Sequence, residues 1–388
     1  IFCFRKIMKV LMLSTDENIF IEGSEVRQRM MDYGNLVEEL HIVVKSQISN
    51  LPVPDLPAGR RQAGLKSQNF GNVFVYPASS HIKIFRIGGK IISQFPRAST
   101  SQLLITSQDP FELGLIGYLL KKRFNLPLQL QAHTDFLSSY FWRESLRNKI
   151  RVLLGKVLVK KADGLRVVSE RVKDSLIAGG YTRKPIFVLP IVYDMDRFSK
   201  SEIMIYLHKK YPDYYFIILS ASRLTREKNV GVAIKAMSEV VKKHPRALLL
   251  IVGSGSEESG LKLLTTRYSL QTNVIFEPWT KDIASYYKSA DVFILTSNYE
   301  GGARSPAEAV ASGLPVVMTD VPPARETVID SKNGFVVPVG NYRQLADRLI
   351  ELISNEDKRV VFQEQSLAGA VGFITKDGGL AAHFEHTV

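Results

Sequence analysis

Short apolar runs rich in β-branched residues alternate with longer stretches of helical period along most of the 388 residues. This alternation is typical of parallel sheets, because two parallel neighbours must be joined by a crossover that is usually a helix. The chain is therefore predicted to be an α/β protein of two Rossmann-like domains, whose parallel sheets face each other across a cleft. Helices are expected, for example, at 25–40, 111–124 and 138–162. The predicted strands lie near 9–14, 41–44, 72–76, 102–106, 128–132, 164–168 and 186–189, and then near 215–220, 247–252, 274–277, 291–295, 315–318 and 335–337.

The boundary between the two domains is predicted in the stretch Pro190–Phe198, after the last strand of the first half. This gives an N-terminal Rossmann-like domain at 8–190, a linker at 191–202 and a C-terminal Rossmann-like domain at 203–360. The remaining residues, 361–388, are rich in Gly and Ala, and we expect an atypical tail without a convincing helix.

Two further segments depart from the pattern. Residues 55–65 combine Pro, Gly and Arg without periodicity and are predicted to be a disordered insert in a surface loop. Met8 opens an ordinary first strand, so it is the expected start of the native sequence. Cys3 is the one cysteine, which argues against disulfide frameworks. No run approaches the roughly 18 apolar residues of a membrane span, and no signal peptide is visible, so a cytoplasmic protein is expected.

The net charge of +13 is confined to the first half of the chain. Residues 1–200 hold 30 Lys and Arg against 17 Asp and Glu, whereas residues 201–388 hold 21 of each kind. Scattered lysines often serve solubility alone. The asymmetry also fits an anionic partner, such as a phospholipid surface or a phosphorylated acceptor.

The segment Ser297–Ala309 carries the strongest local pattern, because it follows a predicted strand with a glycine turn and opens a helix. Free amides and the helix dipole make such a turn suited to anions. It contains two acidic residues, Glu300 and Glu308. Ser305, Pro306 and Glu308 also form a good helix start, with Glu308 closing a capping box. From this segment alone, capping explains Glu308 better than ligand binding does.

Other segments, in the right order, make the sequence resemble glycosyltransferase family 4, retaining enzymes of the two-Rossmann GT-B fold. Each segment is weakly specific by itself, and the ordered set is strong. The resemblance covers roughly residues 8 to 360, and it implies that 8–190 is the acceptor-side domain and 203–360 the nucleotide-sugar donor domain. The segments are the E-x7-E spacing of Glu300 and Glu308, Ala311–Val317 after it, Ser222–Asn229, Val252–Gly255, Asn333–Pro338 and the interdomain Pro190–Phe198.

The resemblance implies a role for each of these residues in binding a nucleotide diphosphate sugar. Fixed cations and amides stabilise the charge that develops on a leaving diphosphate. Arg223 and Lys228 should bind the diphosphate, although in isolation they would be read as surface charges. Glu308 should hold the ribose hydroxyls, and Glu300 should contact or orient the transferred sugar. The turn Gly301, Gly302, Ala303 and Arg304 should line the sugar and phosphate, and its departure from the family's Gly-Phe-Gly-Leu leaves donor preference open.

Four residues of the N-terminal domain are candidates. Gly23 follows the first strand and is explained equally by close approach to the diphosphate and by an ordinary turn. His133 ends a predicted strand, where the family commonly has a histidine that reaches the donor sugar or active centre. A lone histidine is usually structural. The position of His133 at the carboxyl end of a strand favours the functional interpretation, and Glu300 and His133 are the candidate catalytic residues. Asp109 is expected to cap a helix, and Asp135 to cap or to bind acceptor.

The implied activity is metal-independent transfer of a hexosyl unit from a UDP- or GDP-sugar to a glycan or lipid-linked acceptor in cell-envelope polysaccharide or glycolipid synthesis. No cofactor or metal ligand set is apparent in the sequence. No residue is an obvious covalent nucleophile, so the resemblance implies front-face transfer with retention. An inactive nucleotide-sugar-binding homologue and a sugar-nucleotide epimerase of the same fold are the alternatives. Nucleic acid is not an expected partner.

The basic segment 143–173 carries apolar residues at helical spacing: Leu146, Ile150, Leu153, Leu154, Val157 and Leu158. Such a stripe usually packs on the protein's own sheet. A basic amphipathic helix can also lie on an anionic membrane, which would make the protein peripheral on the inner face.

Overall fold

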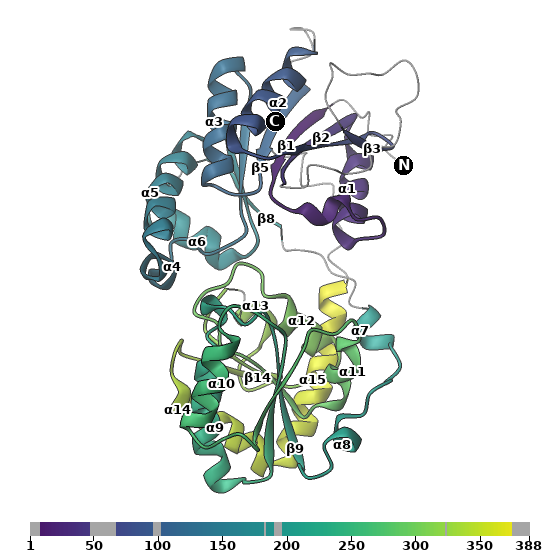
Figure 1. Cartoon of the computed structure of the whole chain (residues 1–388), viewed down its shortest axis with the longest axis vertical. Coiled ribbons are helices and arrows are strands. Elements are labelled where there is room, and N and C mark those ends of the chain that lie inside the picture. Colours follow the sequence, from purple (N-terminus) through teal and green to yellow (C-terminus); the bar gives the residue numbers. More distant parts are fainter. Residues whose placement is uncertain are drawn as a thin grey trace. The chain divides into compact units, whose positions relative to one another are not determined.

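The computed structural model describes residues 8–46, 67–95, 102–181, 184–189, 196–322 and 324–374. The chain divides into two compact units. Among the described residues, the N-terminal unit holds those up to Leu137 and those of Ser145–Leu189, and the C-terminal unit holds Ser138–Glu144 and residues 196–374. Each unit is an α/β sheet with helices on its faces (Figure 1). The α/β class predicted from the sequence is confirmed. Residues 1–7 and the insert predicted at 55–65 lie outside the described residues.

The N-terminal sheet has the order β3-β4-β2-β1-β5-β6-β7-β8, and its pairs are parallel apart from the antiparallel β3 and β4. Apolar runs explain the predicted strands, whereas the three-residue β3 was missed because it is too short and polar. The strands are β1 (Lys9–Ser14), β2 (Glu39–Lys45), β3 (Gln68–Phe70), β4 (Val73–Ala78), β5 (Leu103–Ser107), β6 (Leu128–Ala132), β7 (Gly164–Val167) and β8 (Ile186–Val188).

Four helices of the first half follow a Ser whose side chain accepts a hydrogen bond from an amide of the first turn. The helix predicted at 138–162 is two helices, because Ser145 is extended and its Oγ accepts the Asn148 amide at 3.1 Å. The helices are η1 (Glu17–Phe20), α1 (Glu25–Leu36), α2 (His81–Ser93), α3 (Glu112–Phe124), α4 (Ser139–Glu144), α5 (Leu146–Lys161) and α6 (Glu170–Ala178).

The C-terminal sheet is parallel with the order β11-β10-β9-β12-β13-β14. Counted within this unit, the order is 3-2-1-4-5-6, the doubly wound arrangement that binds ligands beyond the carboxyl ends of its strands. Each sequence-predicted strand of this half has its counterpart. The strands are β9 (Phe216–Ala221), β10 (Ala247–Val252), β11 (Val274–Glu277), β12 (Val292–Leu295), β13 (Val316–Thr319) and β14 (Gly334–Val337).

Alternate residues of the central strands point to opposite faces of this sheet and build two cores. Ile218 belongs to the core beneath α9 and α14, and Ile217 belongs to the core beneath α11 and α12. The helices are α7 (Asp196–Lys200), α8 (Leu207–Lys210), η3 (Arg226–Lys228), α9 (Gly231–Lys243), α10 (Glu258–Arg267), α11 (Ile283–Ser289), α12 (Arg304–Ala311), α13 (Ala324–Thr327), α14 (Tyr342–Ser354) and α15 (Glu356–Ile374).

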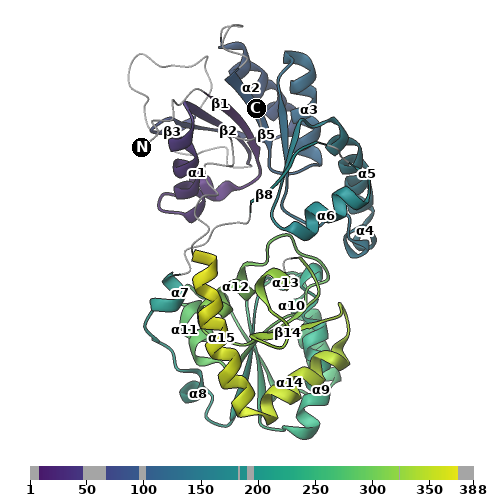
Figure 2. The ribbon, with the colours of Figure 1, turned by 180° about the vertical axis from the view of Figure 1, so that it is seen from behind.

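Two segments differ from the sequence predictions near the ends of this unit. The linker predicted at 191–202 contains α7, whose Phe198 is buried against Tyr287. The tail predicted to lack a helix from 361 instead continues α15 as far as Ile374 (Figure 2). Packing outweighs the Gly- and Ala-rich composition, because Phe362 stacks edge-on against Phe335 and the buried Ser366 donates to the Leu314 carbonyl at 3.2 Å. Residues 375–388 lie outside the described residues.

Candidate donor site

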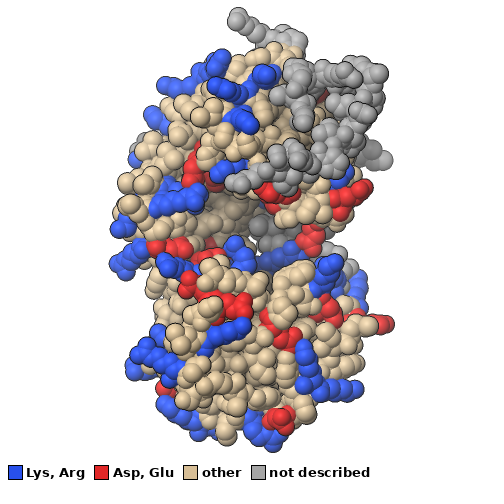
Figure 3. All heavy atoms as spheres, viewed as in Figure 1, with Lys and Arg blue, Asp and Glu red and all other residues tan. Residues whose placement is uncertain are grey.

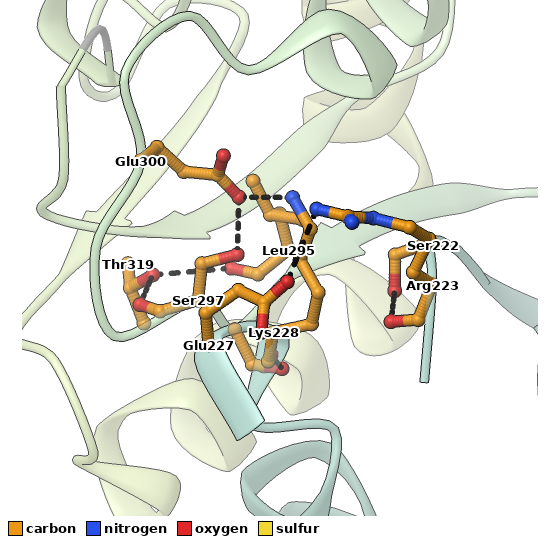
Figure 4. A network of polar contacts seen from close by, with 9 residues as sticks. Ser222, Arg223, Glu227, Lys228, Leu295, Ser297, Glu300 and Thr319 are labelled. Carbon is orange, nitrogen blue, oxygen red and sulfur yellow. Dashed lines mark hydrogen bonds and ion pairs between the residues drawn. The ribbon is translucent and has the colours of Figure 1, made fainter. Parts of the chain in front are cut away.

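Polar side chains of the C-terminal unit gather where β9, β12 and β13 end, in the loops after these strands (Figure 4). Lys228 Nζ lies 2.5 Å from Glu300 Oε1, although the two residues are 72 positions apart. The sheet order explains this contact, because β12 lies directly beside β9. The side chains of Lys228 and Glu300 are 15% and 10% exposed, so they form a largely desolvated ion pair with access to solvent.

Glu300 is held by neighbours that the sequence analysis missed. Ser297 Oγ donates to Glu300 Oε1 at 2.6 Å, and Thr319 Oγ1 in turn donates to the Ser297 carbonyl at 2.7 Å. The carboxylate is therefore fixed by a cation and a hydroxyl at once. Polar residues at the ends of adjacent strands were the available signal, since Thr319 ends β13 and Ser297 follows β12.

Arg223 lies in the same loop and is much more exposed. Its side chain is 75% exposed, and NH2 lies 3.1 Å from Glu227 Oε1. An exposed pair of this kind contributes little to stability. The Arg223 guanidinium can therefore turn to an anionic ligand at small cost.

The loop around Arg223 and Lys228 depends on backbone conformations and close contacts that few residue types allow. Asn229 follows Lys228 with a φ of 45°, and its side chain donates to Asn298 Oδ1 at 2.8 Å. Asn tolerates this left-handed region better than most residues. A Cβ on Gly253 or Gly255 would lie 2.0 or 2.3 Å from the carbonyl oxygens of Ser222 or Leu224. These glycines let the turn after β10 pack directly on the backbone around Arg223.

Glu308 does not close a capping box, so that interpretation is wrong. The helix α12 begins at Arg304 with Ala303 at the N-cap and no side-chain cap, which leaves Glu308 in the second turn. Pro306 is tolerated because the first amides of a helix have no intrahelical partner. Glu308 is 7% exposed, and its Oε1 lies 2.5 Å from Arg304 Nε.

The second oxygen of Glu308 also has a partner. Oε2 accepts the hydroxyl of the buried Tyr287 at 3.1 Å, and burial beside this carboxylate raises the pKa of Tyr287. Sequence reasoning missed Tyr287, because an aromatic residue within α11 looks like an ordinary core residue. Both Glu308 oxygens therefore have partners in the structure.

The turn Gly301–Ala303 joins β12 to α12. Its amides precede the positive end of α12, and Ala303 is buried. Tyr299, just before Glu300, packs edge-on against Phe141 with ring centroids 5.3 Å apart, and its hydroxyl donates to Glu144. Burial and this carboxylate raise the pKa of Tyr299, so its hydroxyl remains protonated. Phe141 and Glu144 lie on α4, in the segment that groups with the C-terminal unit.

His133 and Gly23 belong to the other compact unit, and the group around Glu300 is drawn from the C-terminal unit alone. His133 follows β6, and its Nε2 lies 2.9 Å from Gln131 Oε1. Burial, followed by the charges of Arg166 and Arg29, lowers the pKa of His133 to about 3. The imidazole is therefore neutral at physiological pH.

Gly23 has a φ of 74°, and a Cβ there would meet nothing within 4 Å. The turn conformation alone explains the glycine, and its diphosphate role stays a prediction. Asp109 acts as the cap that was expected, since its Oδ1 accepts the amides of Phe111 and Leu113 at the start of α3. Burial raises the pKa of Asp109. Asp135 follows β6 in a turn, and its acceptor role also stays a prediction.

Among the residues that the structure describes, no three His, Cys, Asp or Glu side chains are grouped as a metal site. Within the same described ranges, no helix is both long and apolar enough to cross a bilayer.

A doubly wound sheet with paired cations and carboxylates at its strand ends is an arrangement that nucleotide-binding domains of two-domain α/β proteins share. Residues 208–367, most of this unit, match the family model described as "Glycosyl transferases group 1". Over these residues the chain matches this family, and the fold of the chain is GT-B.

Two relatives and two solved structures illustrate the similarity. The chain is 38% identical over 146 residues to the poly(glycerol-phosphate) alpha-glucosyltransferase of Bacillus subtilis, covering 37% of this chain and 22% of that protein. It is 28% identical over 243 residues to the alpha-monoglucosyldiacylglycerol synthase of Streptococcus pneumoniae, covering 60% and 55%. In both cases the chain spans less than two thirds of the relative.

The fold of the whole chain is similar to that of a sucrose-phosphate synthase from Thermosynechococcus elongatus, with a TM-score of 0.73, 18% identity and 97% of both chains covered. It is also similar to Anabaena HepE in complex with UDP, with a TM-score of 0.71, 18% identity and coverage of 97% of this chain and 99% of that one. At this identity the likeness concerns the fold.

Proposed function

We propose that this protein is a retaining glycosyltransferase that transfers a hexosyl unit from a UDP- or GDP-sugar, without a metal ion, to a glycan or lipid-linked acceptor of the cell envelope. The observation that carries the proposal is the Lys228–Glu300–Ser297 group at the strand ends, with Arg223 beside it. Cations, carboxylates and helix-end amides together suit a ligand that has both phosphates and hydroxyls.

Arg223 and Lys228 are the proposed diphosphate ligands. Arg223 is exposed, so a phosphate can replace Glu227 as its partner, and the same diphosphate can approach the partly exposed Lys228. Guanidinium groups bind phosphate oxygens through two parallel hydrogen bonds. As the bond to the sugar breaks, these cations stabilise the charge that develops on the leaving diphosphate. The amides of Gly301, Gly302, Ala303 and Arg304 add donors beside them.

Glu300 and Glu308 are the proposed hydroxyl acceptors. Glu300 is already oriented by Lys228 and Ser297, and its remaining oxygen can accept a hydroxyl of the transferred sugar. Glu308 would take the ribose hydroxyls through Oε1 when Arg304 turns toward the phosphates. His133 would contribute a contact to the sugar from the N-terminal unit, and Gly23 would let the backbone approach the diphosphate.

The acceptor class is suggested by what relatives are named for. One relative is a poly(glycerol-phosphate) alpha-glucosyltransferase, another an alpha-monoglucosyldiacylglycerol synthase, and a third a capsular polysaccharide biosynthesis glycosyltransferase of Staphylococcus aureus. These names refer to a glycerol-phosphate polymer, a diacylglycerol lipid and a capsular polysaccharide. They support an acceptor of the same kind for this chain.

The exposed face of α5 supports a membrane-associated acceptor. Leu146, Ile150, Leu153 and Val157 are 74%, 60%, 56% and 55% exposed. At 100° per residue they fall within a sector of about 60°. Val152 and Leu158, on other faces of the helix, are buried in the core. The interpretation that the whole stripe packs on the sheet is thus wrong for these four residues.

Charges flank this exposed face. The sequence of α5 contains six Lys and Arg and no acidic residue. In Figure 3 blue side chains lie with tan surface over the part of the N-terminal unit where Figure 1 shows α5. An apolar stripe bordered by cations suits the interface of an anionic membrane. We therefore propose that the protein binds the inner membrane surface peripherally through α5.

A donor and acceptor panel tests the proposal. The full chain is incubated with UDP-, GDP- and ADP-sugars, with glycerol-phosphate polymer or diacylglycerol lipid as acceptor, and with EDTA throughout. We expect one donor to be consumed, with the α-configuration of the sugar retained in the product by NMR. Nucleotide binding without turnover would favour an inactive homologue, and epimerised donor would favour an epimerase. Activity that EDTA abolishes would contradict the metal-independent assignment.

A further inference from the structure

A chain of buried polar side chains crosses the N-terminal sheet behind His133. Thr106 Oγ1 donates to Gln129 Oε1 at 2.9 Å, and Gln131 Nε2 donates to Thr106 Oγ1 at 2.9 Å. Arg166 NH1 donates to Gln131 Oε1 at 3.1 Å. These four residues come from β5, β6 and β7 and are at most 6% exposed. Buried strand positions are normally apolar, so this chain of hydrogen bonds calls for an explanation.

Arg166 determines which atoms donate and which accept in this series of hydrogen bonds. A guanidinium can only donate hydrogen bonds, so the atom of Gln131 that faces Arg166 must be the carbonyl oxygen. The amide nitrogen of Gln131 then faces Thr106, as the 2.9 Å contact requires. Arg166 also donates to the Leu189 carbonyl, which anchors the guanidinium on the far side.

Gln131 Oε1 also determines which ring nitrogen of His133 carries the proton. Gln131 Oε1 has no proton to give, so the His133 Nε2 that lies 2.9 Å away must carry one. In a neutral imidazole the other nitrogen, Nδ1, is then an acceptor. Nδ1 has no hydrogen-bond partner among the described residues, and His133 is of intermediate exposure.

The surrounding charges oppose protonation of that acceptor. Arg166 on β7 and Arg29 on α1 face the ring, and Tyr33 on α1 lies against Arg166, while Asp135 follows two residues along the chain. Burial and the two arginines lower the pKa of His133 to about 3. An Nδ1 that takes up no proton above this pH cannot serve as a general acid at neutral pH.

We propose that Arg166 is a positioning residue: through Gln131 it fixes neutral His133 as the Nε2–H tautomer, so that Nδ1 accepts a hydrogen bond from a hydroxyl of the transferred sugar. The contact with a sugar rests on the proposed function. The tautomer rests on the buried hydrogen bonds alone.

The tautomer can be observed directly by NMR of the full chain labelled with ¹⁵N-histidine, with His133→Asn used to assign the His133 signals. We expect a protonated Nε2 and an unprotonated Nδ1 that stay unchanged from about pH 5.5 to 9. Arg166→Met lets the Gln131 amide turn, so we expect both tautomers and a kcat about 2- to 10-fold lower. The control Arg171→Met, at an exposed arginine of α6, should change neither. A wild-type Nδ1–H tautomer, or an unchanged tautomer in folded Arg166→Met, would overturn the proposal.

Gln131→Glu is a second variant that keeps the buried charge of Arg166 balanced. Its carboxylate still accepts from Nε2 and raises the pKa of His133. We expect activity within about threefold of wild type at pH 8 and a new loss at acid pH, where the Nδ1 acceptor becomes protonated. A merely structural role predicts no such acid limb, and a pH profile as flat as that of the wild type, with His133 seen to titrate by NMR, would refute the acceptor role. Wild type that shows the Nε2–H tautomer and turns over no donor would reject the proposed function and the sugar contact with it.

Discussion

The candidate sites of the two units balance their cations differently. In the C-terminal unit each candidate cation faces a carboxylate, as Lys228 does with Glu300 and Arg304 with Glu308. In the N-terminal unit Arg166 donates to the neutral oxygens of Gln131 and Leu189. A cation that is paired with a carboxylate can exchange that carboxylate for an anionic ligand. A cation that is held by neutral oxygens instead leaves a positive charge beside the residues around it. The first arrangement suits binding and release of a diphosphate, and the second suits a histidine that must stay neutral.

The largest expected effect comes from breaking the pair at Glu300. Glu300→Gln keeps an oxygen for Ser297 and Lys228 but removes the charge, and we expect transfer to fall by about 100- to 1000-fold. Glu300→Ala should abolish activity, and circular dichroism should show a folded protein. Initial rates at saturating donor measure the effect. Glu239→Gln, in an exposed pair with Lys242, is the control and should remain active.

Arg223 tests whether an exposed cation of the same unit binds the donor. Arg223→Ala should weaken nucleotide binding by about 10- to 100-fold, since a hydrogen bond to a charged group contributes about 1.5–3 kcal/mol. Calorimetric titration with UDP and GDP measures this. Arg226→Ala is matched in exposure and pairs with Glu257 in the neighbouring turn. An equal loss in both variants would show a general effect of charge instead of a defined contact.

The two units also differ in the surface that we expect to bind lipid. The double variant Ile150→Asn with Leu153→Asn should weaken sedimentation with anionic liposomes by about tenfold or more, because both side chains would leave the apolar phase. Binding of the wild type should fall as salt rises. Leu263→Asn, at an exposed leucine of α10 in the C-terminal unit, is the control. Wild-type protein that does not bind anionic liposomes at low salt would contradict the proposed surface.

The smallest effect is expected at Tyr287, which supports Glu308 from within the core. Tyr287→Phe removes one hydrogen bond to a carboxylate and should lower the free energy of unfolding by about 1.5–3 kcal/mol. Urea unfolding measures this, with Tyr268→Phe as the control at a partly exposed tyrosine. We also expect weaker nucleotide binding. An unchanged stability would mean that the contact with Glu308 contributes nothing in solution.

The sequence was sufficient to predict the fold, because the fold depends on local patterns, and it supplied candidate residues for the donor site whose roles stay predictions. Strands were visible as apolar runs, and Arg223, Lys228, Glu300 and Glu308 lie in segments of recognisable order. What could not be predicted depends on contacts between distant segments. Ser297 and Thr319 gain their roles only once β12 and β13 are neighbours, and Tyr287 only once α11 packs beside α12.

Local rules also failed where tertiary packing competes with them. Ser305 looked like a helix cap, yet α12 begins one residue earlier and Glu308 turns to Arg304 and Tyr287 instead. The Gly- and Ala-rich composition hid α15, which is stabilised by contacts of Phe362 and Ser366. Arg166 looked like an ordinary strand residue until the positions of Gln131 and His133 were known.

The most direct test is donor turnover in the absence of acceptor, measured side by side for wild type, Glu300→Gln and Glu239→Gln. Release of free nucleoside diphosphate from a panel of UDP-, GDP- and ADP-sugars reports the donor site without requiring the acceptor. The account predicts slow hydrolysis of one donor by wild type and Glu239→Gln, and a loss of at least 100-fold in Glu300→Gln. Equal hydrolysis by Glu300→Gln and wild type would contradict it.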